Sequence, residues 1–355
     1  MTSSAFEKPI RLGIVGCGAV AQICHLKALV TLRDYDIRYL CDRNLRTAEA
    51  AAQLYGLRAK ITDRTEDLAG NVDAAIVCVW PRQHLPVTLD LLRMGLDVLC
   101  EKPVAASSAD AAEMATAAES AGRIVAVGQW CRCQKNMWIL RKLLALDFIG
   151  EVEEVEAEFG NILAWPMSSG AYFDRSITAG GVMFDGGIHV LDLVVWLFGD
   201  VAVVEYEDDS LGGVETNGVI RGTLSVNGRR VPCRIAASWT HDLRNGIRIS
   251  GGKGRLEARF TERDVVTIHQ EIGGERLESR IGPNGIAMPF RADNPYAAQL
   301  EDFAEAIRRR QPPITPIAST LLPLKIIEAA YSVRRPMLQP WVDAGPVTVC
   351  AAAKS

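Results

Sequence analysis

Three polar side chains share one predicted helix face in this 355-residue sequence. Asp185 and His189 are four residues apart and Asp192 follows three residues later, so a helix beginning near Asp185 places them together. The residues around them are apolar, and polar groups on a buried helix are costly unless they are partnered or functional. A lone histidine is most often a satisfied core residue. A histidine between two aspartates, after a glycine run, indicates a proton-transferring group that works near neutral pH.

Lys102 is a second candidate for chemistry. It lies in Glu101-Lys102-Pro103, directly after the predicted strand 97–100. Ligands of open α/β sheets bind outside the carboxyl ends of the strands. A lysine there could hold a substrate oxygen and, if partly desolvated, exchange a proton. Taken alone, the tripeptide is more typical of a solvated turn.

A glycine-rich turn near the N-terminus predicts a dinucleotide site. Gly16, Gly18 and Ala21 form G-x-G-x-x-A between a predicted strand and a predicted helix, with Ala19 and Val20 inside the turn. The first glycine permits the tight turn, the second lets the backbone approach a pyrophosphate, and the alanine allows close packing of helix and strand. The helix N-terminus then faces the phosphate charge. The alternative is a purely structural turn.

Asp42 ends the next predicted strand, twenty-one residues after Ala21. A carboxylate there can accept hydrogen bonds from the adenosine ribose and would repel a 2′-phosphate, which favours NAD over NADP. Arg43 follows immediately and could instead pair with a phosphate, so NADP stays possible.

The elements that must position these groups fall into two series. In the first, strands alternate with helices, which implies parallel βαβ units. The strands are expected at 10–15, 37–41, 74–80, 97–100 and 124–127, and the helices at 19–32, 84–94 and 106–121.

The second series is rich in alternating strands, as in an antiparallel sheet with one solvated face. These strands are expected at 152–159, 201–207, 216–226, 230–239, 247–250, 255–260 and 265–270, with helices at 137–146, 187–198, 296–310 and 319–333. The sequence therefore predicts a nucleotide-binding α/β domain over residues 1–128 and an α+β domain over residues 129–355.

Composition excludes several classes of function. A net charge of -4 and a pI near 5.8 give no electrostatic attraction to nucleic acid or to anionic lipid. No secretory start and no membrane-spanning apolar run is visible, and the odd number of cysteines, nine, argues against a disulfide framework, so a cytoplasmic protein is expected. Cys131 and Cys133 lack the further ligands of a zinc site, and no metal is expected.

Taken together, these motifs resemble those of the Gfo/Idh/MocA oxidoreductase family, over nearly the whole chain. The resemblance adds the strand ending at Trp80-Pro81, with His84 soon after, and the segment from Gly180 to Gly199. It implies a Rossmann domain, an open-faced, mostly antiparallel β-sheet domain that carries the substrate, and a homodimer or homotetramer.

The resemblance also implies residue roles. Lys102, Asp185 and His189 match the active-site lysine, aspartate and histidine of the family, and Lys102-Pro103 is expected to be a cis peptide bond. Trp80, Pro81, His84, Glu101 and Lys102 are expected beside the cofactor.

Substrate contacts are less specific in the sequence. Trp165, Tyr172 and Arg175 lie in a predicted loop, where aromatic rings could stack on a sugar and the arginine could bind an anion. Ordinary packing is the alternative. Asp192 extends the histidine stripe as a possible substrate contact. Gln129-Trp130-Cys131-Arg132-Cys133 departs from the family pattern and leaves the role of Arg132 open.

The expected activity is NAD(P)-dependent hydride transfer at a secondary carbinol of a sugar or cyclitol. His189 would act as general base, Asp185 would orient it or grip a substrate hydroxyl, and Lys102 would stabilise charge on the reacting oxygen. One alternative is a redox-neutral relative that retains NAD and uses transient oxidation for elimination. The other is a non-catalytic NAD-binding regulator, against which the presence of Lys102 and His189 counts.

Overall fold

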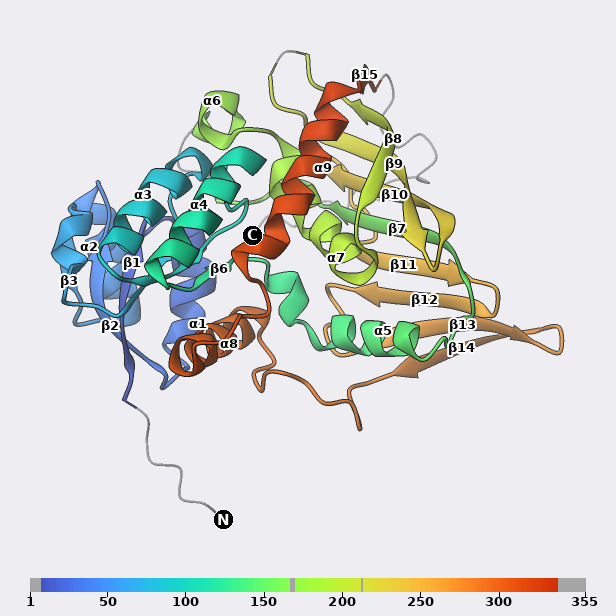
Figure 1. Cartoon of the computed structure of the whole chain (residues 1–355), viewed down its shortest axis with the longest axis horizontal. Helices are drawn as coiled ribbons and strands as arrows, with labels where there is room; N and C mark the ends of the chain where they lie inside the picture. Colours follow the sequence, from blue (N-terminus) through green and yellow to red (C-terminus); the bar gives the residue numbers. More distant parts are fainter. Residues whose placement is uncertain (1–7, 167–169, 212, 338–355) are drawn as a thin grey trace, which may run out of the picture.

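The computed structural model describes residues 8–166, 170–211 and 213–337, which build two β-sheets joined side by side (Figure 1). The first sheet has the order β3-β2-β1-β4-β5-β6, and each neighbouring pair is parallel. Its strands are β1 (Ile10–Val15), β2 (Tyr35–Cys41), β3 (Lys60–Thr62), β4 (Ala74–Val77), β5 (Asp97–Cys100) and β6 (Val125–Val127).

Helices follow most of these strands, and local sequence fixes where two of the longer ones begin and end. Asn44 and Ser107 cap their N-termini by accepting backbone N–H bonds, and Gly56 and Gly122 end them in the left-handed region. The helical segments are η1 (Ala21–Leu26), α1 (Lys27–Leu29), α2 (Leu45–Tyr55), η2 (Thr65–Leu68), α3 (Pro81–Arg93) and α4 (Ser108–Ala121).

The second sheet has the order β14-β13-β12-β11-β7-β10-β9-β8-β15. The pairs β7–β10 and β8–β15 are parallel, and the other pairs are antiparallel. Its strands are β7 (Val152–Gly160), β8 (Val201–Asp208), β9 (Asn217–Val226), β10 (Arg229–Ser238), β11 (Gly246–Gly251), β12 (Gly254–Arg259), β13 (Val266–Ile272), β14 (Glu275–Ile281) and β15 (Arg334–Pro336). This confirms the predicted fold class.

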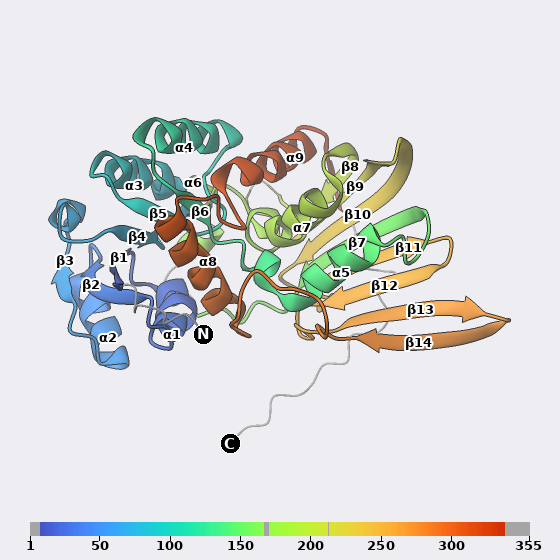
Figure 2. The same ribbon diagram turned by 60° about the horizontal axis from the view of Figure 1, so that its bottom comes forward.

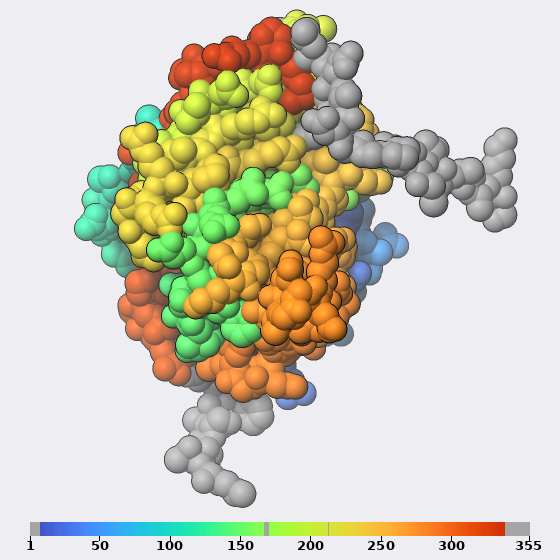
Figure 3. All heavy atoms as spheres, turned by 90° about the vertical axis from the view of Figure 1, so that its right-hand side faces the viewer, coloured from blue at the N-terminus to red at the C-terminus, as the bar shows by residue number. Residues whose placement is uncertain are grey.

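Helices α5, α7 and α9 lie on one side of this sheet, as Figures 1 and 2 show. On the other side the strands themselves form the surface (Figure 3). The helical segments of this half are η3 (Trp130–Cys133), α5 (Lys135–Ala145), η4 (Gly170–Phe173), α6 (Arg175–Thr178), η5 (Met183–Gly187), α7 (Ile188–Phe198), α8 (Pro295–Arg309), η6 (Ile317–Thr320) and α9 (Leu321–Ser332).

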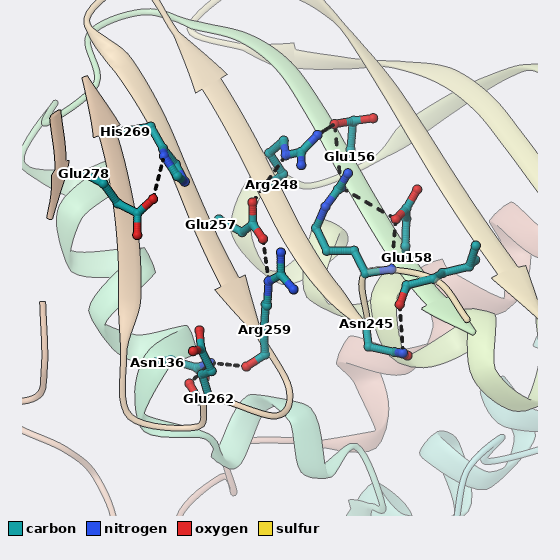
Figure 4. A network of polar contacts seen from close by, with 12 residues as sticks. Asn136, Glu156, Glu158, Asn245, Arg248, Glu257, Arg259, Glu262, His269 and Glu278 are labelled. Atoms are coloured by element: carbon teal, nitrogen blue, oxygen red, sulfur yellow. Dashed lines mark hydrogen bonds and ion pairs between the residues drawn. The ribbon is translucent and has the colours of Figure 1, made fainter. Parts of the chain in front are cut away.

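Alternation along β7 explains the two faces of the sheet. Val155 and Ala157 are fully buried in the core beneath the helices. Glu156 and Glu158 point to the open face and pair there with arginines of neighbouring segments, including Arg248 (Figure 4). Because successive side chains of a strand point to opposite faces of the sheet, β7 contributes both to the core and to a charged outer surface.

The run 175–198, which contains α7, is the one described helical stretch with the length and hydropathy of a membrane span. However, 72% of its most apolar window is buried inside the protein. A core helix needs the same apolar composition because it is surrounded by other elements.

Helix α8 belongs to the core of the first sheet, although it follows the second sheet in sequence. Leu300 and Phe303 pack into the same buried cluster as Leu12 and Leu40, and the Tyr35 hydroxyl donates to the Leu300 carbonyl at 2.6 Å. Figure 2 shows α8 beside α1. A helix from the second predicted domain, 129–355, thus packs in the core of the first sheet.

Candidate active site

A cavity of about 1380 Å³ lies between the two sheets, at the carboxyl edge of the first. Single-ligand pockets usually measure roughly 300–1,000 Å³, so this one has room for a dinucleotide and a second molecule. Both halves of the chain line it, from the glycine turn after β1 to Trp239 at the end of β10. Trp80, Pro81, Trp165 and Tyr172 also line it, as predicted for cofactor and substrate contacts.

The glycine turn has the shape that a pyrophosphate needs. Gly16 has φ +88°, and a Cβ there would lie 2.7 Å from the carbonyl carbon of Cys78, so a side chain is excluded. A Cβ at Gly18 would meet nothing within 4 Å, because this backbone borders the cavity. Ala19 and Val20 line the cavity, whereas Ala21 is fully buried at the helix–strand contact. These residues fit a bound dinucleotide.

Asp42 faces the same cavity and has a fixed side chain. Its carboxylate accepts the Cys17 N–H at 2.8 Å and the Asn44 N–H at 2.9 Å. An ionised carboxylate has about four acceptor sites, so acceptor capacity remains for ribose hydroxyls. Arg43 lines the cavity beside it.

The turn after β5 is built around a buried carboxylate. The Lys102–Pro103 peptide bond is cis, as the resemblance implied. Glu101 accepts the Lys102 N–H at 3.0 Å and contacts His25 Nε2 at 2.6 Å. Burial alone would raise the pKa of Glu101. His25 and Lys102 outweigh this effect and lower the pKa, so Glu101 stays ionised. His25, which the sequence did not single out, thus anchors the turn that carries Lys102.

Asp185 is the centre of the polar contacts in the cavity. Its Oδ1 accepts from Lys102 Nζ at 2.7 Å, and its Oδ2 accepts from the Tyr172 hydroxyl at 2.6 Å and from Trp239 Nε1 at 3.1 Å. Burial would raise its pKa, but Lys102 more than offsets this, so the pKa of Asp185 is lowered. Burial would lower the pKa of Lys102, and Asp185 raises it above its usual value.

His189 is oriented by Gln129 and not by Asp185, which corrects one prediction. Its Nδ1 lies 3.0 Å from Gln129 Oε1, an acceptor, so the ring carries its proton on Nδ1. Burial, followed by the charge of Lys102, holds the pKa of His189 well below its usual value. The ring is therefore neutral, and Nε2 keeps a lone pair at the cavity wall.

The structure places four predicted contacts away from the cavity lining. Arg132 and Asp192 form a bidentate ion pair with 2.5 and 2.7 Å contacts and are both buried. Arg175 lies over the Tyr331 ring, 5.1 Å from its centroid. His84 is buried, with its ring nitrogens near the carbonyls of Pro103 and Val79, so it supports the turn and does not reach the cavity.

Glu215 is a second residue that sequence reasoning missed. Its Oε1 accepts the N–H groups of Gly181 and Met183, both at 3.1 Å, and the Tyr331 hydroxyl at 2.6 Å. It therefore fixes the start of the π-helical turn Met183–Gly187, which carries Asp185. Because it comes from a loop 30 residues later in the chain, no local spacing reveals it.

Among the described residues, no group of three or more His, Cys, Asp or Glu side chains could hold a metal ion. Eight cysteines in these ranges are free and buried.

Comparison with known proteins gives two family matches. Residues 10–129 match the model of the Gfo/Idh/MocA oxidoreductase family, described as an NAD-binding Rossmann fold, and residues 138–257 match a C-terminal domain of the same family.

Relatives and a solved structure agree with these matches. The chain is 31% identical to D-glucoside 3-dehydrogenase of Escherichia coli over 205 residues, 57% of this chain and 58% of that protein. It is 27% identical to trans-1,2-dihydrobenzene-1,2-diol dehydrogenase of Mus musculus over 90% of this chain and 96% of the relative. A 3-ketoreductase from Actinomadura kijaniata, solved with NADP and TDP-benzene, has the same fold, with a TM-score of 0.80 at 19% identity over 94% of this chain and 100% of the other.

Proposed function

Because the chain belongs to the Gfo/Idh/MocA family of NAD-binding oxidoreductases, we propose that it moves a hydride between a nicotinamide cofactor and a secondary carbinol or ketone of a sugar or cyclitol. One observation carries the proposal. Lys102, Asp185 and His189 meet at the wall of a cavity that continues to the glycine turn. A hydroxyl held there would find both a cationic donor and a neutral base.

The cofactor would supply the hydride acceptor or donor. The backbone at Gly18 and the helix that follows would hold its pyrophosphate, and Asp42 its adenosine ribose. The Asp42 carboxylate supports NAD as the preferred cofactor, because a 2′-phosphate beside it would be repelled.

Lys102 would grip the reacting oxygen. An ammonium group has three N–H donors. Two of them are directed at Asp185, at Oδ1 (2.7 Å) and at the backbone oxygen (3.0 Å). The third has no partner among the residues that the structure describes, so it can donate to a substrate oxygen and stabilise negative charge developing there.

His189 would take the hydroxyl proton at Nε2. Gln129 keeps the other ring nitrogen protonated, and the lowered pKa keeps the ring neutral, which is the form that a general base needs. The role of Asp185 is to hold Lys102 charged and in place, since its own oxygens already accept from Lys102, Tyr172 and Trp239.

A sugar or cyclitol fits the aromatic surroundings of this site. Tyr172 and Trp239 lie with ring centroids 5.1 Å apart next to Asp185, and aromatic faces pack well on the C–H faces of sugar rings. The relative named for a glucoside supports the same substrate class.

The open sheet face supports a homodimer or homotetramer. Its Glu156, Arg248 and Glu257 form a charged network (Figure 4). Light scattering of the purified protein tests this assembly: a multiple of 38.7 kDa is expected, and a monomer at micromolar concentration would contradict it.

The activity test is direct. Purified protein is incubated with NAD or NADP and a panel of cyclitols, aldoses and glycosides, and absorbance of the reduced nicotinamide is followed. A rise with one substrate class that is lost in His189→Ala is the expected result. Tightly held NAD with no net reduction on any panel member would instead indicate redox-neutral chemistry.

A further inference from the structure

The acidic, basic and histidine side chains that line the cavity form two separate groups. One group follows β2 and β3 and comprises Asp42, Arg43, Asp63, Arg64 and Glu66. The other consists of Glu101, Lys102, Asp185 and His189. In the sheet order, β2 and β3 lie three and four strands from β5, which is roughly 14 and 19 Å at the usual strand spacing. The arginines therefore lie at the adenosine end, far from Lys102.

Among the described residues that line the substrate end, no positive charge is left over for an anionic group. Lys102, the one lysine or arginine there, is neutralised by Asp185 at 2.7 Å, and its remaining N–H donor serves the reacting oxygen. The N–H groups of Gly181 and Met183, which open the π-helical turn, are taken by Glu215. A phosphate or carboxylate placed here would lose its water and gain no matching partner. The site suits an uncharged ring.

The rim beside this end is apolar and exposed. Ile162 and Trp165, on the loop that follows β7, line the cavity yet are 56% and 38% exposed. Leu163 lines it between them. Large apolar side chains gathered at a cavity mouth are typical of a surface that a ligand covers.

This rim is held firmly next to the catalytic groups. The Asn161 N–H donates to the Ser238 carbonyl at 3.2 Å, and the Leu163 N–H donates to the Trp239 carbonyl at 2.8 Å. Trp239 also donates through its indole to Asp185. A ring held beside Lys102 and His189 would therefore lie next to the loop.

We infer that the substrate is an uncharged glycoside whose apolar or aromatic aglycone covers Ile162 and Trp165. This inference rests on the proposed function, because it takes the oxidised sugar to lie beside Lys102 and His189. The loop 161–166 then acts as an aglycone subsite, and sugar phosphates, sugar acids and nucleotide sugars are excluded as good substrates.

The test compares kcat/KM, with saturating NAD, for D-glucose, its methyl and phenyl glycosides in both anomeric forms, D-glucose 6-phosphate and D-glucuronate. A phenyl glycoside is expected to exceed its methyl counterpart about tenfold or more, since single methylenes in apolar pockets already discriminate roughly tenfold. The two anions are expected to fall about a hundredfold below glucose.

Three variants locate the effect. Ile162→Ala and Trp165→Ala should bring the phenyl-to-methyl ratio close to one. Ile272→Ala is the matched control, because Ile272 is 58% exposed at the end of β13 and does not line the cavity, so the ratio should not change. An unchanged ratio in both rim variants, or a preference for the anions, would overturn the inference.

Calorimetry of the NAD-loaded protein with phenyl glucoside separates the two proposals. Turnover without aglycone preference would leave the dehydrogenase function standing and remove the subsite. Binding that weakens in Ile162→Ala and Trp165→Ala, without any turnover, would keep the subsite and contradict the proposed function. Absence of both binding and turnover would overturn both.

Discussion

Removal of Asp192 should destabilise the fold and leave substrate recognition intact. The Arg132 and Asp192 side chains are 2% and 0% exposed, and their two contacts measure 2.5 and 2.7 Å. In Asp192→Ala the Arg132 guanidinium would stay buried with only the Ser319 hydroxyl as side-chain partner, at 3.1 Å. Breaking a buried ion pair in this way costs roughly 3–5 kcal/mol.

That cost is a large part of the total stability of a typical protein, about 5–15 kcal/mol. For a unit of 150–250 residues it corresponds to a fall in Tm of roughly 6–20 °C. The assay is thermal unfolding followed by circular dichroism. Asp192→Asn, which retains one hydrogen-bond acceptor, should show a smaller fall in Tm. It replaces Asp192→Ala in this assay if the alanine variant does not fold.

The double variant Arg132→Met/Asp192→Leu separates packing from recognition. Replacing both charges by apolar groups of similar size removes the unpaired charge, so Tm should return toward the wild-type value. Neither residue lines the cavity, so the KM for the sugar should stay within about threefold of the wild-type value. Such a change corresponds to well under 1 kcal/mol of binding free energy. A double variant with wild-type Tm and a KM raised more than tenfold would refute this reasoning and return Arg132 or Asp192 to substrate binding.

Three further changes test other parts of the account. Asp185→Asn removes the charge that raises the pKa of Lys102 most, so that burial, which lowers this pKa, is opposed mainly by Glu101 and the alkaline loss of kcat/KM should move to lower pH; an unmoved limb would show that Lys102 does not act as a cation. Asp42→Asn should shift the NAD-to-NADP ratio of kcat/KM toward NADP about tenfold, an effect of roughly 1.4 kcal/mol, and an unchanged ratio would remove Asp42 from cofactor selection. Burial raises the pKa of Asp302 to about 6, so the folded state binds its proton more tightly and stability falls as pH rises from about 4 to 6. Asp302→Asn should therefore raise the free energy of unfolding by up to about 3 kcal/mol at pH 8 and by much less at pH 4, as urea unfolding would measure. Equal increases at the two pH values would contradict a raised pKa of Asp302.

The sequence predicted those parts of the site that depend on local structure. Gly16 and Gly18 are recognisable because a strand, a tight turn and a helix follow each other within a few residues. In the structure Gly16 is sterically required, and Gly18 borders the open cavity. Asp185 and His189 were placed together by helical spacing, and both line the cavity.

The misplaced residues depend on contacts between distant segments. Asp192 shares the predicted stripe, but Arg132, sixty residues earlier, draws it into a buried pair. The π-helical turn before α7 also changes the register that an ideal α-helix would keep. His25 and Glu215 reach Glu101 and Gly181 across the fold, and no period or motif encodes such approaches.

Three strands, β3, β14 and β15, lie at sheet edges and were missed for a related reason. β14 is exposed at six of its seven positions and charged at four, so it lacks the buried face that predicts a half-buried strand, and it pairs with β13 along its whole length. β15 is three residues long and pairs with the distant β8. Edge strands of this kind are set by their neighbours more than by their own sequence.

The most direct test of the central claim follows the hydrogen itself. A sugar substrate identified by the panel is deuterated at its reacting carbon and incubated with the protein and NAD, and the reduced cofactor is analysed by mass spectrometry. We predict one deuterium in the reduced nicotinamide for the wild-type protein, and none formed by His189→Ala or Lys102→Ala. Reduced cofactor without deuterium, or deuterium that stays in the sugar product, would contradict hydride transfer between the carbinol and the nicotinamide.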